Sequence, residues 1–256
     1  MRNRARNAWL GRGLGIYDVG MCGRYSIVRG DRILTVVPNV TMPANLRLVG
    51  RYNAAPSQLL PVITNDSRDV QMLKWGLIPS WAKDAKVGYK MINARVETLA
   101  EKPAYRKALE SRRCLIPADG FYEWRKTPNG TKTPMYIHMK DGELFAFAGL
   151  WERWKDEDGK EVKSFTIITT EPNELMKTIH NRMPAIVPRE GYLDWLENGS
   201  TEWLKPYPAE EMEAYAVSPR VNSPGRDEAG MIERVEEMPV EETPSEEAGP
   251  GQMSLF

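Results

Sequence analysis

The chain has 256 residues, of which 41% are hydrophobic and 27% charged, as is typical of a globular domain. Two cysteines in this length exclude a disulfide framework and favour reduced thiols in a cytoplasmic compartment. No stretch approaches the roughly 20 apolar residues that a membrane span requires. The net charge of zero hides an asymmetry: residues 1–20 carry +3, residues 236–256 carry −6 and the body between them +3. A mildly basic body permits a nucleic-acid partner without demanding one.

The N-terminal half predicts several short strands. Residues 1–20 contain four glycines and no clear period, so we expect a disordered extension or an upstream artefact of start-site choice. They also lack the apolar segment of a secretory signal. A strand is expected from Cys22 through Ile27, a helix or strand at 32–37, a loop at 51–56, and strands at 59–63 and 70–75.

The C-terminal half continues this pattern. Helices are expected at 103–111, 171–178 and 190–197, and strands at 114–116, 120–124, 135–139, 144–151, 162–169, 185–187, 213–217 and 231–235. Asp141-Gly142 predicts a hairpin between the strands on either side of it, and Asp158-Gly159 joins a third strand to them. Many short strands with few helices indicate an α+β fold with a mostly antiparallel, barrel-like sheet in a single domain.

Cys22 follows a methionine, Met21, that could itself start translation. If Met21 is the initiator and is removed, the α-amine and thiol of Cys22 can condense with an aldehyde into a five-membered thiazolidine ring. An α-amine suits this attack because its pKa is about 8, well below that of lysine. The alternative interpretation is a buried apolar side chain, as for most free cysteines.

Other residues are suited to proton transfer or to nucleic-acid binding. Glu123 lies among aromatic residues, and burial there would raise its pKa; otherwise it is an exposed strand residue. His180 lies in a polar loop, where function is common, whereas His138 lies in a strand and is expected to pack. With two histidines and no zinc-binding spacing, we expect no metal and no cofactor. Trp75, Trp81 and Trp124 could form a stacking and phosphate-binding groove with Arg24, Arg51 and Arg95, although tryptophans are more often core residues.

Eight short blocks resemble the SOS-response-associated peptidase (SRAP) family, whose members covalently capture abasic sites in single-stranded DNA. The blocks are MCGRY, RYNAAP, WGLIPSW, NARVET, CLIPADGFYEW, a PMYI hairpin, IHNRMP and VSPRVN, in the family's order. The resemblance implies an SRAP domain at residues 21–235, between the extension at 1–20 and a disordered acidic tail at 236–256.

The resemblance also implies roles for individual residues. Cys22 would form the thiazolidine crosslink, and Asn93 would orient its amine and the sugar. Glu123 would act as acid and base, and His180 would assist proton transfer and slow reversal. Arg24 and Arg95 are similar to residues that hold phosphates, and Trp75 lies in the block that forms the DNA-binding shelf.

Two features depart from the family pattern. The extension would tie the Cys22 amine into an amide, so we expect Met21 to be the true start; if the extension is real, the autoproteolysis proposed for the family could release Cys22. The second feature is the C-terminal Gln252–Phe256, which resembles the pentapeptide by which bacterial proteins dock onto the replication sliding clamp. Gln252 would hydrogen-bond, and Leu255 and Phe256 would fill an apolar pocket.

These features together predict a monomeric, nucleoid-associated crosslinking protein with lyase-type chemistry. Two other classes stay open. One is a cysteine peptidase that uses Cys22 and His180, and the other is a non-enzymatic DNA-binding module tethered to the clamp.

Overall fold

The computed structural model describes residues 22–67 and 69–236. The predicted extension at 1–20 and the clamp-binding peptide at 252–256 lie outside the described residues, so the domain limits stay predictions. Within the described part, no helix is long and apolar enough to cross a membrane.

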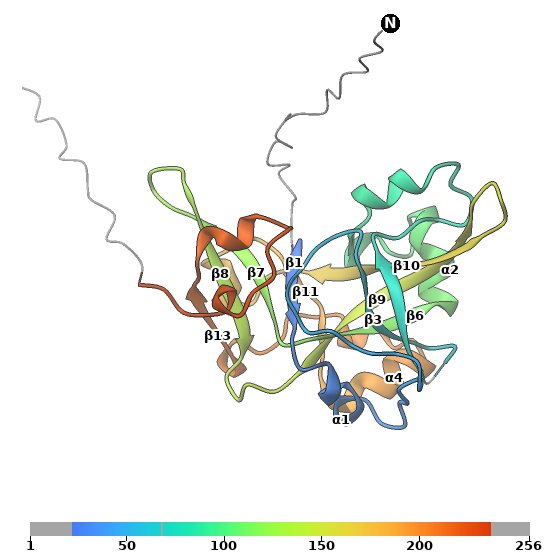
Figure 1. Cartoon of the computed structure of the whole chain (residues 1–256), viewed down its shortest axis with the longest axis horizontal. Coiled ribbons are helices and arrows are strands. Elements are labelled where there is room, and N and C mark those ends of the chain that lie inside the picture. Colours follow the sequence, from blue (N-terminus) through green and yellow to red (C-terminus); the bar gives the residue numbers. More distant parts are fainter. Residues whose placement is uncertain (1–21, 68, 237–256) are drawn as a thin grey trace, which may run out of the picture.

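Five strands close into a barrel (Figure 1). In order round the ring they are β10 (Glu161–Thr170), β4 (Val70–Trp75), β3 (Leu59–Thr64), β6 (Arg113–Ala118) and β9 (Phe145–Lys155), which pairs with β10 again. Three short strands extend it: β5 (Asn93–Arg95) and β11 (Met183–Pro184) on β10, and β12 (Ile186–Val187) on β9. Closure leaves fewer exposed strand edges and encloses one large apolar core. The expected barrel-like α+β fold is therefore confirmed.

A second sheet packs against the barrel. Its order is β13 (Met212–Ala216), β8 (Lys132–Met139), β7 (Gly120–Lys126), β1 (Arg24–Ile27) and β2 (Arg51–Ala54), and Figure 1 shows β1 on the side of this sheet that meets the barrel. Side chains alternate between the faces of a strand. Phe121 of β7 contacts the barrel residue Phe147, whereas Tyr122 joins a small apolar cluster on the opposite face.

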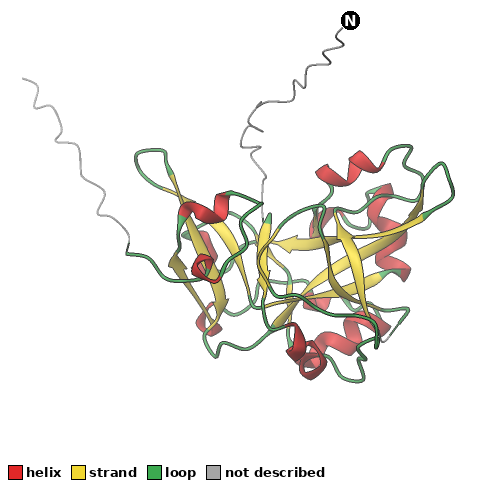
Figure 2. Ribbon diagram, viewed as in Figure 1, coloured by secondary structure: helices red, strands yellow, loops and turns green. Residues whose placement is uncertain are grey.

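Short helices cover the sheets and connect the strands (Figure 2). The α-helices are α1 (Ile33–Val36), α2 (Pro103–Ser111), α3 (Glu174–Lys177) and α4 (Tyr192–Glu197). The 3₁₀ turns are η1 (Gly30–Arg32), η2 (Ala85–Lys90), η3 (Val96–Thr98), η4 (Arg189–Gly191), η5 (Thr201–Trp203), η6 (Ala209–Glu211), η7 (Pro219–Asn222) and η8 (Ala229–Met231). The predicted helix at 103–111 is confirmed, with its proline in the first turn.

The hairpin predicted at Asp141-Gly142 is wrong. Met139 at the end of β8 pairs with Met212 of β13, whereas Phe145 at the start of β9 pairs with Ala118 of β6. Gly142 still has the positive φ of a tight turn, +68°, but this turn carries the chain from one sheet to the other. The hairpin at Asp158-Gly159 is confirmed, because β9 and β10 pair across it.

Two further predictions need correction. The expected loop at 51–56 begins with the edge strand β2, whose backbone is held on the outside by Asp227: its Oδ1 accepts hydrogen bonds from Tyr52 N–H and Asn53 N–H. The expected strand at 231–235 is instead the end of η8 and a single bridge between Val217 and Arg234. In both cases a distant segment supplies the partner.

Arg113 supports the packing of α2 and α4 against the barrel. Only 5% of the residue is exposed, and its guanidinium donates to five backbone carbonyls at 2.7–3.1 Å. These carbonyls end α2 and α4, and they belong to Leu109, Glu110, Trp195, Leu196 and Glu197. One cation thus satisfies carbonyls that a helix cannot pair internally.

Arg113→Ala should therefore lower the free energy of unfolding by about 3 kcal/mol or more, because it strands several buried carbonyls and leaves a void. Urea unfolding followed by tryptophan fluorescence measures the change. Arg106→Ala, on the exposed side of α2, is the matched control and should cost less than about 0.5 kcal/mol. Equal effects of the two substitutions would contradict this role for Arg113.

Candidate functional site

Cys22 and Glu123 meet where the second sheet packs on the barrel. Cys22 lies two residues before the start of β1 and is fully buried. Its backbone N–H donates a hydrogen bond of 2.5 Å to Oε1 of Glu123 in β7. Arg24 of β1 lies opposite Tyr122 of β7, so the antiparallel register places Glu123 beside the start of β1. Glu123 shares the barrel-facing side of β7 with Phe121 and is only 3% exposed.

Burial sets the proton affinities of this pair. Desolvation raises the pKa of the Glu123 carboxyl to about 7, and hydrogen bonds from the Cys22 and Trp124 backbones and the charge of Lys132 oppose the rise. Burial, and then the nearby Glu123, also raise the pKa of the Cys22 thiol well above its ordinary value. The carboxyl can therefore give and take a proton near neutral pH, whereas the thiol stays protonated.

Asn93 reaches the same point from β5. Its Nδ2 donates to the Cys22 carbonyl at 3.3 Å. β5 lies parallel to β10, with Asn93 beside Ile167, and the hydroxyl of Tyr105 in α2 donates to the Asn93 carbonyl at 3.3 Å. Three of the four predicted catalytic residues, Cys22, Asn93 and Glu123, are thus linked through Cys22 by hydrogen bonds.

His180, the fourth, lies in the loop between α3 and β11. Its backbone N–H donates to the Met176 carbonyl at 2.7 Å, and its Nδ1 accepts from the backbone N–H of Arg182 at 3.2 Å. β11 pairs with the last residues of β10, where Thr169 lies beside both Pro184 and Arg95. The loop therefore lies near the segment that follows Asn93.

His138 packs in the second sheet. Its Nε2 lies 3.1 Å from Oε1 of Glu213, and its ring centre lies 5.5 Å and 5.4 Å from those of Tyr136 and Tyr215. Its Nδ1 lies 2.8 Å from the carbonyl oxygen of Met139. These contacts agree with the packing role expected for this histidine.

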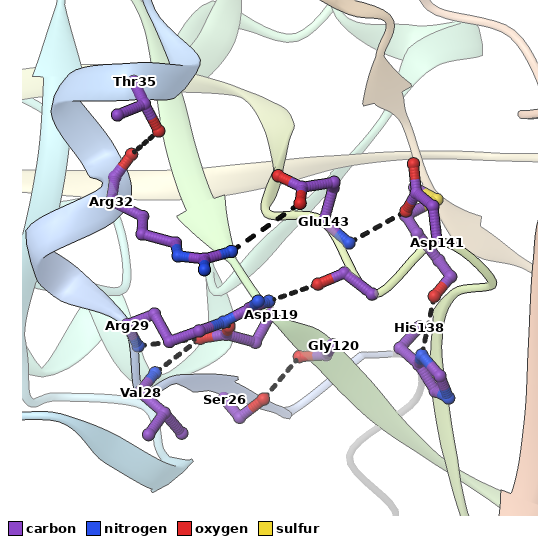
Figure 3. Close-up of polar contacts among 12 residues, drawn as sticks. Ser26, Val28, Arg29, Arg32, Thr35, Asp119, Gly120, His138, Asp141 and Glu143 are labelled. Atoms are coloured by element: carbon purple, nitrogen blue, oxygen red, sulfur yellow. Dashed lines mark hydrogen bonds and ion pairs between the residues drawn. The ribbon is translucent and has the colours of Figure 1, made fainter.

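Asp119 anchors the end of β1 that lies away from Cys22 (Figure 3). This 8%-exposed carboxylate accepts hydrogen bonds from the backbones of Val28 and Arg29 at 2.5 and 3.2 Å, and from the Arg29 side chain at 2.5 Å. Arg29 in turn donates to the Gly142 carbonyl at 2.6 Å. Asp119 was visible in the CLIPADGFYEW block, but the sequence offered no sign of its partners.

The predicted DNA-binding arginines have different surroundings. Arg24 donates to Asn53 Oδ1 at 3.1 Å and to the Val221 carbonyl at 2.7 Å, so these neutral oxygens orient its charge without cancelling it. Arg51 forms an ion pair with Asp227 at 3.0 Å. Arg95 is exposed at the end of β5.

Trp75 cannot stack on a base in this structure. Only 1% of it is exposed, its ring stacks on Phe165, and its Nε1 donates to the Ile92 carbonyl at 3.0 Å. This expectation for Trp75 is therefore corrected, because Trp75 faces the core. The exposed rings nearby in the chain are Trp81 (66%) and Tyr89 (63%), with the ammonium of Lys74 over Tyr89.

A surface hollow of about 380 Å³ lies beside α3, but no predicted site residue lines it. Among residues 22–67 and 69–236, no three or more His, Cys, Asp or Glu side chains gather in a way that suits a metal ion.

A family model, several relatives and solved structures are similar to this chain. The sequence model of the family described as "SOS response associated peptidase (SRAP)" matches residues 21–224. Abasic site processing protein YoqW of Bacillus subtilis is 53% identical over 190 residues, which cover 71% of this chain and 85% of YoqW. Abasic site processing protein YoaM, also of B. subtilis, is 51% identical over 222 residues, covering 83% of this chain and 98% of YoaM. The solved structure of a Bacteroides thetaiotaomicron protein is 30% identical with a TM-score of 0.73, covering 84% of this chain and 100% of that one.

The buried Glu123 should make stability depend on pH. Because its pKa is about 7 in the folded chain and about 4.3 in an unfolded one, the folded state holds this proton more tightly. The Glu123 contribution therefore lowers stability as pH rises between these two values.

Glu123→Gln removes this titration. The unfolding free energy of Glu123→Gln minus that of the parent should therefore increase by about 2–3 kcal/mol when the pH is raised from 5 to 8. Chemical denaturation of the full chain at several pH values measures the difference. Glu174→Gln, at an exposed side chain of α3, is the control and should show a nearly flat difference. A flat difference for Glu123→Gln as well would show that the carboxyl is not perturbed.

Proposed function

The chain belongs to the SOS response associated peptidase (SRAP) family, and we propose that it forms a covalent thiazolidine adduct between Cys22 and abasic sites in single-stranded DNA. The names of its abasic site processing relatives support this substrate. The observation that carries the proposal is the 2.5 Å hydrogen bond from Cys22 N to Glu123. It places the atom that would become the terminal amine directly on a group that can take and return a proton.

The proposed reaction has two bond-forming steps. Once Cys22 is N-terminal, Glu123 takes a proton from its ammonium, and the free amine attacks the aldehyde carbon of the ring-opened deoxyribose. The resulting carbinolamine loses its hydroxyl as water when Glu123 returns the proton, which leaves a protonated imine. The thiol then adds across the C=N bond: sulfur bonds to carbon, the C=N electron pair returns to nitrogen, and the thiol proton passes to the Glu123 carboxylate. Aminothiol and aldehyde thus give a thiazolidine and one water.

Other residues would hold the substrate and assist proton transfer. Asn93, on the Cys22 carbonyl, would keep the terminal residue oriented, and His180 would donate the proton that ring opening requires. Arg24, Arg51 and Arg95 would bind phosphates. The exposed rings of Trp81 and Tyr89 would stack on bases, since such stacking tolerates any sequence.

The surroundings of Cys22 favour this chemistry over a cysteine peptidase. A peptidase nucleophile needs a lowered thiol pKa, whereas burial and Glu123 raise that of Cys22. A non-enzymatic DNA-binding module has no need of a buried carboxyl, which costs stability above its pKa. Glu123 therefore favours a catalytic function.

The position of the chain's start decides activity in this proposal. In the printed sequence Cys22 N is an amide nitrogen, which cannot attack an aldehyde. A protein that begins at Cys22 should form a band resistant to denaturing gel electrophoresis with single-stranded DNA bearing one abasic site, and the protein that begins at Met1 should form none.

Two variants of the protein that begins at Cys22 distinguish the role of the amine from that of the thiol. Cys22→Ala and Cys22→Ser keep the amine but remove the thiol, so each should give a crosslink only when borohydride reduces the imine. A durable crosslink by Cys22→Ala without reduction would contradict the thiazolidine. Cleavage of unrelated peptides by the Cys22 form would support the peptidase instead.

We further propose that Gln252–Phe256 tethers the protein to the sliding clamp, where the acidic tail would raise its local concentration on template DNA. Replacing Leu255 and Phe256 with alanine keeps length and charge but removes the apolar anchors, so affinity for the clamp should fall at least about tenfold. Titration calorimetry measures this, with Ser245→Ala, in the tail outside the peptide, as the control. Equal affinities would contradict the tether.

A further inference from the structure

A two-pronged ion pair joins the loop of His180 to the segment that follows Asn93. Nη1 of Arg182 binds Oε1 of Glu97, and Nη2 lies 2.9 Å from Oε2. The same Nη2 donates to the Thr169 carbonyl at 2.8 Å. Glu97 belongs to η3, which directly follows β5. One guanidinium thus connects η3, the last residues of β10 and the loop before β11.

This pair is unlike an exposed surface ion pair. The Glu97 side chain is 50% exposed but that of Arg182 only 15%, and a guanidinium held by both oxygens of one carboxylate has a fixed orientation. The hydrogen bond from Arg182 lowers the pKa of Glu97, so the carboxylate stays charged. By contrast, Lys177 and Glu174 of α3 pair through single atoms with more than half of each side chain exposed, and such pairs contribute little.

The backbone of Arg182 acts on His180 directly. Its N–H donates to Nδ1 of His180 at 3.2 Å, so Nδ1 carries a lone pair, and in the neutral ring the proton lies on Nε2. On the other side, the backbone of His180 is held by the Met176 carbonyl at the end of α3. The orientation and tautomer of the imidazole therefore depend on where residue 182 lies.

We propose that Arg182 and Glu97 are positioning residues that hold His180 in its Nε2–H tautomer. The ion pair fixes the position of Arg182, and the backbone N–H of Arg182 then donates to Nδ1 of His180. The ring proton therefore lies on Nε2, which is the atom that donates it. The inference rests on the proposed function only where it assigns proton transfer to His180. Without the ion pair, the loop can turn, Nδ1 loses its donor and the ring populates both tautomers. A misplaced proton donor slows a reaction strongly, since about 1 Å can cost on the order of 100-fold in rate.

The test uses the tautomer itself, which a merely structural role would not change. The full chain contains only two histidines, so a long-range ¹H–¹⁵N spectrum shows two imidazoles, and His138→Gln assigns them. At a pH above the observed titration of both imidazoles, His180 of the parent should show the Nε2–H pattern. Glu97→Gln removes the carboxylate charge, and Arg182→Lys keeps the positive charge but cannot bind both carboxylate oxygens in the same way. Each variant should show a mixture of the two tautomers. Glu174→Gln is the matched control and should resemble the parent.

The same variants, made in the protein that begins at Cys22, should form the crosslink on the order of tenfold more slowly at saturating DNA. An unchanged His180 pattern in Glu97→Gln and Arg182→Lys, with cooperative unfolding retained, overturns the inference. If the parent forms no crosslink, the proposed function fails, and the tautomer comparison still decides whether the pair positions His180. If one variant does not fold, the other decides.

Discussion

The hydrogen bond between Cys22 N–H and the Glu123 carboxyl is the contact on which the site depends. A carboxyl that is 3% exposed can be kept in a core only if it is protonated or hydrogen-bonded, and the Cys22 backbone provides a donor at 2.5 Å. Glu123 lies in the second sheet and Cys22 just before it, but the desolvation comes from packing against the barrel. The arrangement of the two sheets therefore sets the proton affinity at the start of β1.

Anchors at a distance keep this contact in register. Asp119 holds the far end of β1 through the backbones of Val28 and Arg29, and Tyr105 of α2 holds the Asn93 carbonyl. They restrict the two backbones that bring Cys22 and Asn93 together, which is how a rigid scaffold keeps a reactive group in place.

Local patterns predicted the elements well and their partners poorly. Proline followed by good helix formers marked α2, and Asp158-Gly159 marked the β9–β10 hairpin. Asp141-Gly142 carries the same turn signal, yet its flanking strands lie in different sheets, because a turn type sets a local reversal and not the choice of strand partner. The aromatic neighbours of Glu123 correctly indicated burial. The DNA-binding role that the resemblance implied for Trp75 misplaced its side chain, since exposure depends on which strand face meets the core.

The site could be assembled from the sequence only through the family resemblance. Cys22 lies 71 residues from Asn93 and 101 from Glu123 in the chain, and no spacing rule spans such separations. What the structure adds is the order of the proposed steps. The buried thiol holds its proton, so a thiolate is scarce, whereas an amine at Cys22 N would lie against a carboxyl with a pKa of about 7. In the proposed reaction, nitrogen would therefore attack first, and sulfur would close the ring only after an imine has formed.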